Sequence, residues 1–590
     1  MQNVVFKRNH TAMGSRKMKQ WLREPLNDVA EINLRLDGVE ALYCQPLLRN
    51  HIRENLKQIY DFERLTGRVA CGNANGKDLI ALRNSILVLP EIKDALSELD
   101  GEILSQMNQK INPLTEVYQL IENAIVEDPP FLIREGGLIK AGFSEELDHI
   151  KFSIKDGKHW ISNLENTEKE RTGIRSLKVG YNKVFGYYIE VTKSYYDMVP
   201  ENYIRKQTLA NAERYITPEL KEMESLVLNA ETKINQLEYE LFTGVRKEIE
   251  KYIEMIQETS AAVAGLDVLC AFAEVSDKLG YVKPIIDDSM ELEILKGRHP
   301  VIEQTIPDGL FVSNDTWLND SDASMLLITG PNMAGKSTYM RQTALIVLMA
   351  QAGCFVPCER ARIGVVDRIF TRIGASDNLA QGQSTFFVEM SELSYILNTA
   401  KPRSLVILDE IGRGTSTYDG LSIAWAAVEY LCNETTHIRT LFATHYHELT
   451  VLQQQLHGVR NLNVDVSEEN GNIVFLHKII EGSASRSYGI HVAKLAGIPG
   501  KLLDRAQDKL AELEQHSTDQ NPYLLSDKEG EYSSFTTVKE KEEYSEEKQI
   551  SLFDFAPASV VEKLRAVNLM EITPSQAFKI LEELKETIDD

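Results

Sequence analysis

The chain has 590 residues, which is more than one hydrophobic core usually serves, so we expect three or more domains. Hydrophobic residues make up 43% of the sequence and charged residues 26%, which is ordinary for a soluble protein, and no apolar run reaches the roughly 18 residues of a membrane span, so we expect no membrane partner. The net charge of −24 argues against a nucleic-acid partner unless basic residues gather locally.

The first 125 residues are predicted to be helical. Stretches such as VAEINLRLDGVEALY and LIALRNSILVLPEIKDAL space their apolar residues by three and four, which predicts a helical core domain over 1–125. Pro129 and Pro130 end this pattern. Residues 152–192, from FSIKDGKHWISNL to LKVGYNKVFGYYIEVTK, then change to β-rich alternation, which predicts a β-rich domain with a flanking helix over 126–216.

A second long helix is predicted after the β-rich domain. Thr217 can cap this helix, and Pro218 suits its first turn. The apolar spacing then continues for about 40 residues, which as a single helix would span about 60 Å. We therefore expect a returning lever helix and a further part of the core over 217–284, and the β-rich domain at the far end of two long helical arms, with an ordinary helical bundle as the alternative.

Charge is distributed unevenly along the chain. Residues 171–215 hold eight lysines and arginines against four acidic residues, so this part of the β-rich domain is basic although the chain is acidic. Residues 515–548 hold nine acidic residues against four basic ones, with Ser, Thr and Tyr between them, which predicts an acidic disordered linker. Because charge acts locally, the basic segment keeps a polyanion among the candidate partners.

Strand-like and helical segments alternate from residue 285 onward, which predicts an α/β nucleotide domain over 285–482. The expected strands are MLLIT (325–329), SLVILD (404–409) and RTLFAT (439–444). After the first of them, GPNMAGKS fits the phosphate-loop pattern G-x-x-x-x-G-K-[ST] between an apolar strand and an apolar helix, which is the context that the pattern requires. The residues predicted to bind nucleotide phosphates are Gly330, Pro331, Asn332, Met333, Ala334, Gly335, Lys336, Ser337 and Thr338.

Each residue type at this predicted site suits phosphate chemistry. The glycines let backbone N–H groups turn toward phosphate oxygens, Lys336 supplies a positive charge, and the following helix adds its positive N-terminal end. Ser337 offers a hydroxyl to Mg²⁺, and Asp409, at the end of the second strand, would hold the metal through its water shell. Glu410 would align and polarise the attacking water, unless Asp409 and Glu410 are only a solvated acidic pair. His445, after the third strand, would reach the terminal phosphate or that water as a phosphate sensor.

Other candidate residues are expected to be structural. His447 lacks the strand-end position of His445, and we expect it at the surface. Cys354 and Cys358 have no second pair and no histidine at zinc spacing. These two residues are predicted to be buried reduced thiols, not a metal site, and the scattered cysteines indicate a cytoplasmic protein.

With these motifs the chain resembles the MutS family of DNA mismatch repair ATPases. TGPNMAGKST together with DEIGRGTSTYDG is far more specific than a phosphate loop alone. The similar stretches run through almost the whole chain: TAMGSRKMKQWLREPL (11–26), ERTGIRSLKVGYNKVFGYYIEVTK (170–193), RKQTLANAERYITPELKE (205–222), GRHPVIE (297–303), TGPNMAGKSTYMRQ (329–342), STFFVEMSE (384–392), LDEIGRGTSTYDGLSIAWA (408–426), ATHYHEL (443–449) and SYGIHVAKLAGIP (487–499).

The resemblance implies an ABC-type ATPase that uses ATP and Mg²⁺. It also implies a homodimer, or a tetramer, in which each site is completed by the partner subunit. Ser384 matches the position that reaches across to the partner's γ-phosphate, and 412–420 matches the loop that links the two sites. Phe311 and His477 fall where the family sandwiches adenine, and 483–514 resembles its helix-turn-helix dimerisation element.

Duplex DNA, MutL and the β sliding clamp are the partners that the resemblance implies. The peptide QISLFDF (549–555) looks like one that repair proteins dock on the sliding clamp, through Gln549, Leu552 and Phe553, with a segment folded back on its own chain as the alternative. Residues 556–590 look like a helical C-terminal domain. The family's clamp module grips the DNA backbone through contacts that depend on salt and carry no base sequence. The matching polar or cationic residues are Lys178, Asn182, Lys183, Arg205, Lys206, Gln207, Asn211 and Arg214.

The family normally carries mismatch-reading and connector domains ahead of the matching segment. The reader inserts the Phe of a Phe-x-Glu motif beside a mispair, where an apolar wedge lets the DNA kink. Three such triplets occur, at 143–145, 272–274 and 387–389, but none lies in the family's Gly-x-Phe-Tyr-Glu setting. We therefore expect a truncated MutS in which ATP still controls clamping on DNA. The alternatives are a MutS-related ATPase that acts on other DNA structures, an ABC-type transporter ATPase, and a non-catalytic scaffold.

Overall fold

The computed structural model describes residues 8–520, apart from 183, 185, 308, 332–333, 375–384, 433–436, 470–471 and 484–488. The chain divides into two compact units, 1–507 and 508–590, and the elements that follow belong to the first, except for the end of the last helix. The predicted sliding-clamp peptide and the predicted C-terminal domain lie outside the described residues.

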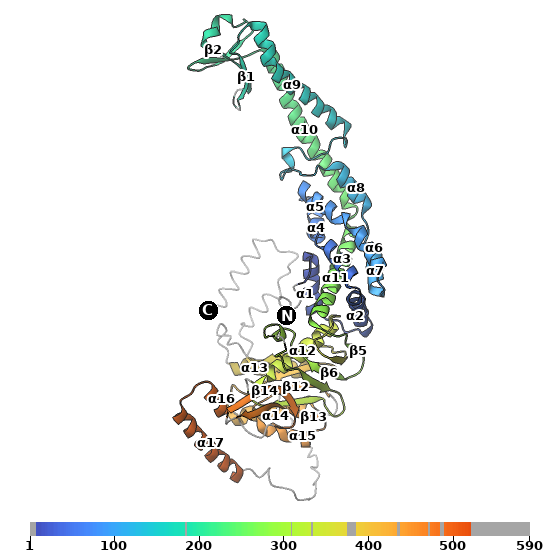
Figure 1. Cartoon of the computed structure of the whole chain (residues 1–590), viewed down its shortest axis with the longest axis vertical. Coiled ribbons are helices and arrows are strands. Elements are labelled where there is room, and N and C mark those ends of the chain that lie inside the picture. Colours follow the sequence, from blue (N-terminus) through green and yellow to red (C-terminus); the bar gives the residue numbers. More distant parts are fainter. Residues whose placement is uncertain are drawn as a thin grey trace, which may run out of the picture. The chain divides into compact units, whose positions relative to one another are not determined.

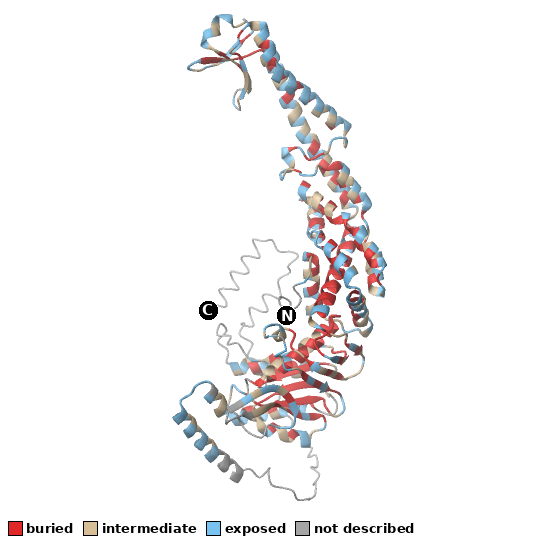
Figure 2. Cartoon of the chain, viewed as in Figure 1, coloured by how far each residue is buried: buried red, intermediate tan, exposed pale blue. Residues whose placement is uncertain are grey.

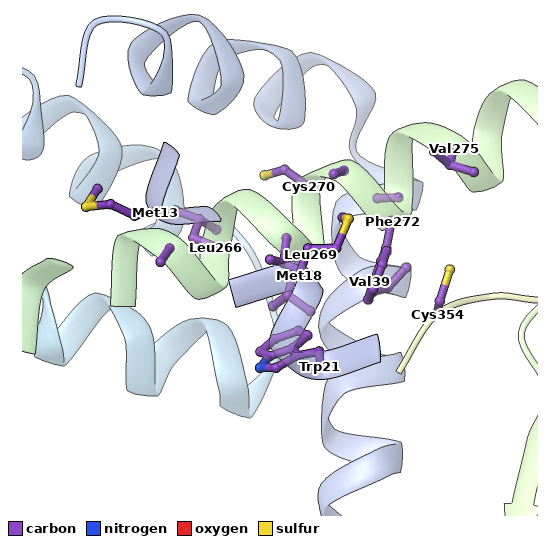
Figure 3. Packing of buried hydrophobic residues seen from close by; sticks show 14 of the residues in the cluster. Met13, Met18, Trp21, Val39, Leu266, Leu269, Cys270, Phe272, Val275 and Cys354 are labelled. Carbon is purple, nitrogen blue, oxygen red and sulfur yellow. The ribbon is translucent and has the colours of Figure 1, made fainter. Parts of the chain in front are cut away.

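The helical part of the first unit is built around one buried helix, α11 (Ile253–Leu279), labelled in Figure 1. This helix is long and apolar enough to cross a membrane, but 89% of its most apolar stretch is buried inside the protein, as in the core helix of a globular domain. Figure 3 shows Phe272 of α11 near Trp21, and the centroids of the two rings are 6.3 Å apart. The surrounding helices are α1 (Ala12–Arg23), α2 (Val29–Cys44), α3 (Pro46–Leu56), α4 (Phe62–Ala70), α5 (Gly76–Leu87), α6 (Leu89–Ser97), α7 (Glu102–Lys110) and α8 (Thr115–Ala124).

Polar side chains fix where these helices begin. Asp28 caps α2 by accepting a hydrogen bond from a backbone N–H of the first turn, and Asn75 and Asp78 form a reciprocal capping box at α5. Thr11 caps α1, and its hydroxyl also donates to Asp267 of α11 at 2.8 Å. The N-terminal helix is therefore tied to the central helix as well as packed on it.

A paired helical arm carries a small sheet. The chain passes along α9 (Glu145–Thr172), forms the strands, and returns along α10 (Pro218–Glu250), which packs against α9. Figure 1 shows the sheet at the end of these two helices, and Figure 2 shows that the arm is more exposed than the helices around α11. The sheet is antiparallel with the order β1-β2-β4-β3, and its strands are β1 (Lys178–Asn182), β2 (Gly186–Thr192), β3 (Ile204–Thr208) and β4 (Ala212–Ile216).

Two sequence predictions for this arm need correction. Residues 152–172 were predicted to be β-rich but belong to α9. The buried residues of α9 are Leu147, Ile154, Gly157, Ile161, Leu164 and Glu168. Their spacing of three, four or seven is helical, and Gly157 lies at this interface because a side chain there would meet Val227 of α10. The predicted helix of about 40 residues is also wrong, because α10 ends at Glu250 and Thr217 caps a helix of 33 residues.

The rest of the first unit contains two sheets, as expected of an α/β region. The smaller has the order β5-β9-β6-β7 and the larger β10-β11-β12-β8-β13-β14, with parallel pairing from β10 to β13. The strands are β5 (Ile285–Asp287), β6 (Leu292–Gly297), β7 (Asn314–Leu318), β8 (Met325–Thr329), β9 (Arg360–Gly364), β10 (Ile369–Ile373), β11 (Leu405–Asp409), β12 (Arg439–Ala443), β13 (Val459–Glu469) and β14 (Asn472–Glu481). The helices are α12 (Lys336–Gln351), α13 (Thr385–Thr399), α14 (Thr417–Leu431), α15 (Leu452–Gln455), α16 (Gly489–Leu495) and α17 (Gly500–Gln520).

The strands of the larger sheet position the site. The predicted strands 325–329, 404–409 and 439–444 are present as β8, β11 and β12, which are neighbours and parallel. Their carboxyl ends therefore meet at one edge of the sheet, which is where ligands bind in sheets of this kind. At the other end of the chain, α17 continues to Gln520, so the linker prediction is wrong for 515–520, where the helical pattern of LAELEQ carries on.

One junction connects the phosphate-loop helix to the helical core. The side chain of Gln351, the last residue of α12, donates to Leu26 O at 2.7 Å and to Val366 O at 2.9 Å. Its Oε1 accepts from Val366 N at 2.9 Å, and its carbonyl accepts from Leu26 N at 3.0 Å. Arg35 of α2 adds a bond to Ala352 O at 3.2 Å while its guanidinium stacks over Trp21. The end of α12 is thereby held against the turn between α1 and α2.

Candidate functional site

The loop between β8 and α12 has the backbone that the phosphate-loop pattern predicts. Gly330 and Gly335 both have positive φ angles, of 129° and 107°, which only glycine adopts without strain. The helix α12 begins directly after Gly335, so its free N–H groups point toward the loop. Of the predicted loop residues, Ala334 is buried, Pro331 is half-buried, and Asn332 and Met333 lie outside the described residues.

Lys336 is enclosed by this loop. It is 1% exposed, and its Nζ donates to Gly330 O. Burial lowers the pKa of Lys336 to about 8, although the carboxylates of Glu410 and Asp409 oppose the change. A buried ammonium held among backbone dipoles is suited to an anionic ligand, which would balance its charge.

Asp409, the last residue of β11, lies beside the start of α12. Burial raises the pKa of Asp409, although a hydrogen bond from the Ser337 hydroxyl opposes the change. Its Oδ1 is buried and has no hydrogen-bond partner among the residues that the structure describes. An unpaired buried carboxylate oxygen next to a hydroxyl fits the hydrated Mg²⁺ that the sequence predicts at Ser337 and Asp409.

Glu410 is held in an unusual conformation. Its φ of 60° is left-handed, which is strained for a residue with a side chain. Its Oε1 lies 2.5 Å from His445 Nε2, and its Oε2 lies 2.6 Å from a guanidinium nitrogen of Arg413. Burial alone would raise the pKa of Glu410, but His445, Arg413 and Lys336 together hold it below its usual value. The carboxyl group is therefore ionised at neutral pH.

Sequence reasoning brought Glu410 and His445 to this edge of the sheet but missed Arg413. The signal was a cation three residues after Glu410, within the quoted stretch GRGTSTYDG. His447, predicted at the surface, is half-buried instead, and burial lowers its pKa. It lies in the short helix after β12, which packs down onto the sheet through Leu449.

A cavity of about 460 Å³ adjoins the phosphate loop. Phe311 and His477, predicted from the family resemblance to sandwich adenine, both line it, together with Gly335, Ser337 and Thr338. His477 has a φ of 54°, its ring lies 3.1 Å from Ala334 O through Nδ1, and its carbonyl accepts from the Asn314 side chain at 3.0 Å. Two rings and the loop of α12 thus share one cavity of a size suited to a small ligand.

The structure describes some, but not all, of the other residues for which the sequence predicts a role in the α/β region. Ser384 lies outside the described residues. Cys354 and Cys358 are buried free thiols, as expected, and burial raises their pKa values. Among the described residues, no cluster of His, Cys, Asp or Glu is arranged to hold a metal by protein ligands alone.

Six of the predicted DNA-binding residues lie on strands of the small sheet: Lys178, Asn182, Arg205, Lys206, Gln207 and Arg214. Lys178, Glu190 and Arg214 are opposite one another on β1, β2 and β4, so they form one row across the sheet. The other face carries Ile189 and Tyr215, which are part of the cluster that packs on the helices. The row therefore lies on the face turned away from α9 and α10.

These residues differ in how far they are free to meet a ligand. Arg214 binds Glu190 at 2.9 Å and Gln207 at 3.0 Å and stacks over Tyr188 at 4.2 Å, so the fold already uses it and its charge is partly balanced. Arg205 pairs with Glu213 but is 63% exposed. Lys178, Lys206 and Asn211 are exposed, Asn182 is half-buried, and Lys183 lies outside the described residues.

Comparisons with known proteins indicate one family along most of the chain. A family model described as MutS domain III matches residues 4–273, and one described as MutS domain V matches 326–514. The DNA mismatch repair protein MutS of Alkaliphilus oremlandii is 50% identical over 99% of this chain and 66% of its own length, and that of Alkaliphilus metalliredigens is 51% identical over the same shares. The protein of that name from Halothermothrix orenii is 50% identical over 99% of this chain and 67% of its own length. The chain thus spans about two thirds of the length of these relatives.

Proposed function

The chain belongs to the MutS family, and on this premise we propose that it is a Mg²⁺-dependent ATPase of DNA mismatch repair whose nucleotide state controls its grip on duplex DNA. The observation that carries this proposal is the convergence of Lys336, Asp409, Glu410 and His445 at one sheet edge, where three parallel strands end. The relatives are named DNA mismatch repair proteins, and we assign this process to the chain because it belongs to the same family.

The catalytic part of the proposal assigns a task to each side chain. Lys336 and the N–H groups at the start of α12 bind phosphate oxygens. Mg²⁺, held by Ser337 and by Asp409 through water, would neutralise charge on the phosphates. Glu410 orients the attacking water and takes its proton. His445 and Arg413 each occupy one carboxylate oxygen of Glu410, and each oxygen keeps a further lone pair for that water.

The base of the nucleotide is proposed to lie between Phe311 and His477. Support comes from the cavity that these two side chains share with Thr338. Adenine can stack on an aromatic ring and an imidazole without polar contacts to the base, so a cavity with few charged groups is sufficient.

The DNA-binding part of the proposal places the duplex against the outward face of the small sheet. Exposed cations such as Lys178 and Lys206 suit phosphate contacts, which are electrostatic and independent of base sequence. The same proposal includes homodimer formation with Ser384 acting in the partner's site, recruitment of MutL and docking of QISLFDF on the sliding clamp. It also includes the predicted domain boundaries, apart from the start of the linker.

The direct test is ATP hydrolysis by the purified chain with Mg²⁺, measured with and without duplex DNA. Replacement of Lys336 by alanine removes a charge that is buried against the phosphate site, so hydrolysis should fall to background. Lys401→Gln, which removes an exposed charge elsewhere in the α/β region, serves as the control. Hydrolysis that survives in Lys336→Ala would contradict the assignment of the site.

A further inference from the structure

The strained turn at Glu410 is held by a residue for which the proposed function has given no role. Glu410 N donates to Ala443 O at 2.9 Å, which fixes the turn on the side of β12. On its other side the chain passes through Gly412, whose φ of 93° is also left-handed. A left-handed glutamate persists only where its surroundings fix it, so the contacts of Gly412 decide whether this turn keeps its shape.

Gly412 is fixed on three sides. Its N–H donates to Glu389 Oε1 at 2.5 Å, and its carbonyl accepts from the Tyr446 hydroxyl at 3.1 Å. Its Cα packs against the first turn of α14, where a Cβ at Gly412 would lie 2.6 Å from Gly420 O. Both backbone polar groups of Gly412 are therefore satisfied by side chains from other elements.

Glu389 is a buried carboxylate with a specific set of partners. It belongs to α13, and Oε2 lies 3.5 Å from a guanidinium nitrogen of Arg372 on β10. Arg372 also pairs with Glu392, at 3.0 Å, which is about half exposed. A buried ion pair contributes little to stability by comparison with apolar packing, so stability alone does not account for a carboxylate at this position.

We propose that Glu389 is a positioning residue for ATP hydrolysis, which holds the Gly412 peptide so that the strained turn keeps Glu410 in place beside the attacking water. This inference rests on the proposed function. Glu389 does not touch the nucleotide. It acts through Gly412, two residues after Glu410, and through the same turn it places Arg413 against the Glu410 carboxylate. The triplet 387–389, which does not match the mismatch-reading motif, thereby has a function in the ATPase region.

The test compares Glu389→Gln with Glu389→Met in the full chain. The two side chains have similar size, but only the amide oxygen of glutamine can accept the Gly412 N–H. We expect Glu389→Met to lower kcat at least about tenfold, because a misplaced catalytic group costs rate steeply, while KM and the affinity for a fluorescent ADP analogue change less than about twofold. Glu389→Gln should keep most of the wild-type kcat.

A matched control separates positioning from loss of the ion pair. Glu392→Gln removes the other carboxylate on Arg372 without touching Gly412, and it should leave kcat unchanged. If Glu389→Met does not fold, as judged by thermal unfolding, Tyr446→Phe replaces it, because it removes the bond to the Gly412 carbonyl and should lower kcat in the same direction with nucleotide affinity kept.

Several results would overturn the proposal. These are an unchanged kcat in Glu389→Met, or in Tyr446→Phe where that variant replaces it; an equal loss in Glu389→Gln and Glu389→Met; a loss in Glu392→Gln as large as in Glu389→Met; or a fall in nucleotide affinity that matches the fall in kcat. A wild-type chain without ATPase activity would instead contradict the proposed function itself.

Discussion

The nucleotide edge of the larger sheet and the outward face of the arm's small sheet both carry charged side chains, but they hold them in opposite ways. At the nucleotide edge Lys336 is 1% exposed and Asp409 and Glu410 are fixed by named partners. On the small sheet Lys178, which belongs to the outward row, is exposed, and Lys206 on β3 is exposed as well. Bond-breaking chemistry requires charges that are fixed before the substrate arrives, whereas a grip on a polyanion requires only accessible charges.

The sharpest way to test this contrast is to remove one fixed charge. In Glu410→Gln the carboxylate that we propose orients the attacking water becomes a neutral amide, so kcat should fall by about 10² to 10⁴. The affinity for duplex DNA without nucleotide should not change, because Glu410 belongs to the α/β region and not to the small sheet. We would measure steady-state ATPase rates and DNA binding by fluorescence anisotropy. A normal turnover rate would remove Glu410 from the mechanism.

Removing accessible charges from the small sheet should weaken DNA binding and leave ATP hydrolysis unchanged. In the double variant Lys178→Gln/Lys206→Gln the DNA dissociation constant should rise by about tenfold or more. The magnitude of the slope of the logarithm of the association constant against the logarithm of the salt concentration should fall by about two. ATP hydrolysis without DNA should stay at the wild-type rate. The control is Lys77→Gln/Lys401→Gln, which removes two exposed lysines outside the small sheet. Equal weakening in both double variants would show that DNA responds to total charge and not to these two lysines of the small sheet.

Nucleotide affinity should depend on pH because of Lys336. Its pKa in the free protein is about 8, and bound phosphates favour the charged amine and raise that pKa. Binding therefore takes up a proton above pH 8, and the affinity for ADP should fall by about tenfold between pH 7 and pH 9. Titrations with a fluorescent ADP analogue would measure this fall. Lys336→Ala should bind weakly with a flat profile over the same range, and a wild-type affinity that rises with pH would contradict the assignment.

The junction at Gln351 offers the smallest but most specific comparison of the two regions. Gln351→Glu would lose the bonds that its Nε2 donates to Leu26 O, Asn27 Oδ1 and Val366 O, which loosens the end of α12 from the helical core. We expect ADP affinity and nucleotide-free DNA affinity to change less than about twofold, while the effect of ATP on DNA affinity falls by about fivefold. Gln455→Glu, an exposed position on α15, makes the same chemical change away from the junction. An unchanged ATP effect would exclude this route.

Much of the nucleotide site could be predicted because its signals are local. The glycines, Lys336 and the strand-end positions of Asp409 and His445 follow from motif spacing and from the rule that parallel strands share an edge. Glu389 and Arg413 were missed because their partners are distant in sequence or belong to the same turn, and apolar periodicity carries no trace of such contacts. The role of Arg214 within the sheet was hidden for the same reason, since Glu190 and Gln207 approach it only after the strands pair.

The arm shows where residue composition misleads. Residues 152–172 mix aromatic and branched side chains with Gly157, which favoured strands, but the interface with α10 is spaced by three and four and decides the outcome. The break between α10 and α11, at residues 251–252, has no proline or glycine to announce it. Only the burial of α11 among the core helices shows why two helices form there.

The central claim is that nucleotide bound at the buried site around Lys336 changes how tightly the exposed cations of the small sheet bind DNA. The most direct measurement is the DNA dissociation constant of Glu410→Gln at fixed salt, with empty nucleotide sites and with saturating ATP and Mg²⁺, because this variant should hold ATP without consuming it. We expect the two constants to differ by at least about fivefold. Equal constants, with ATP binding verified in the same sample, would contradict the account.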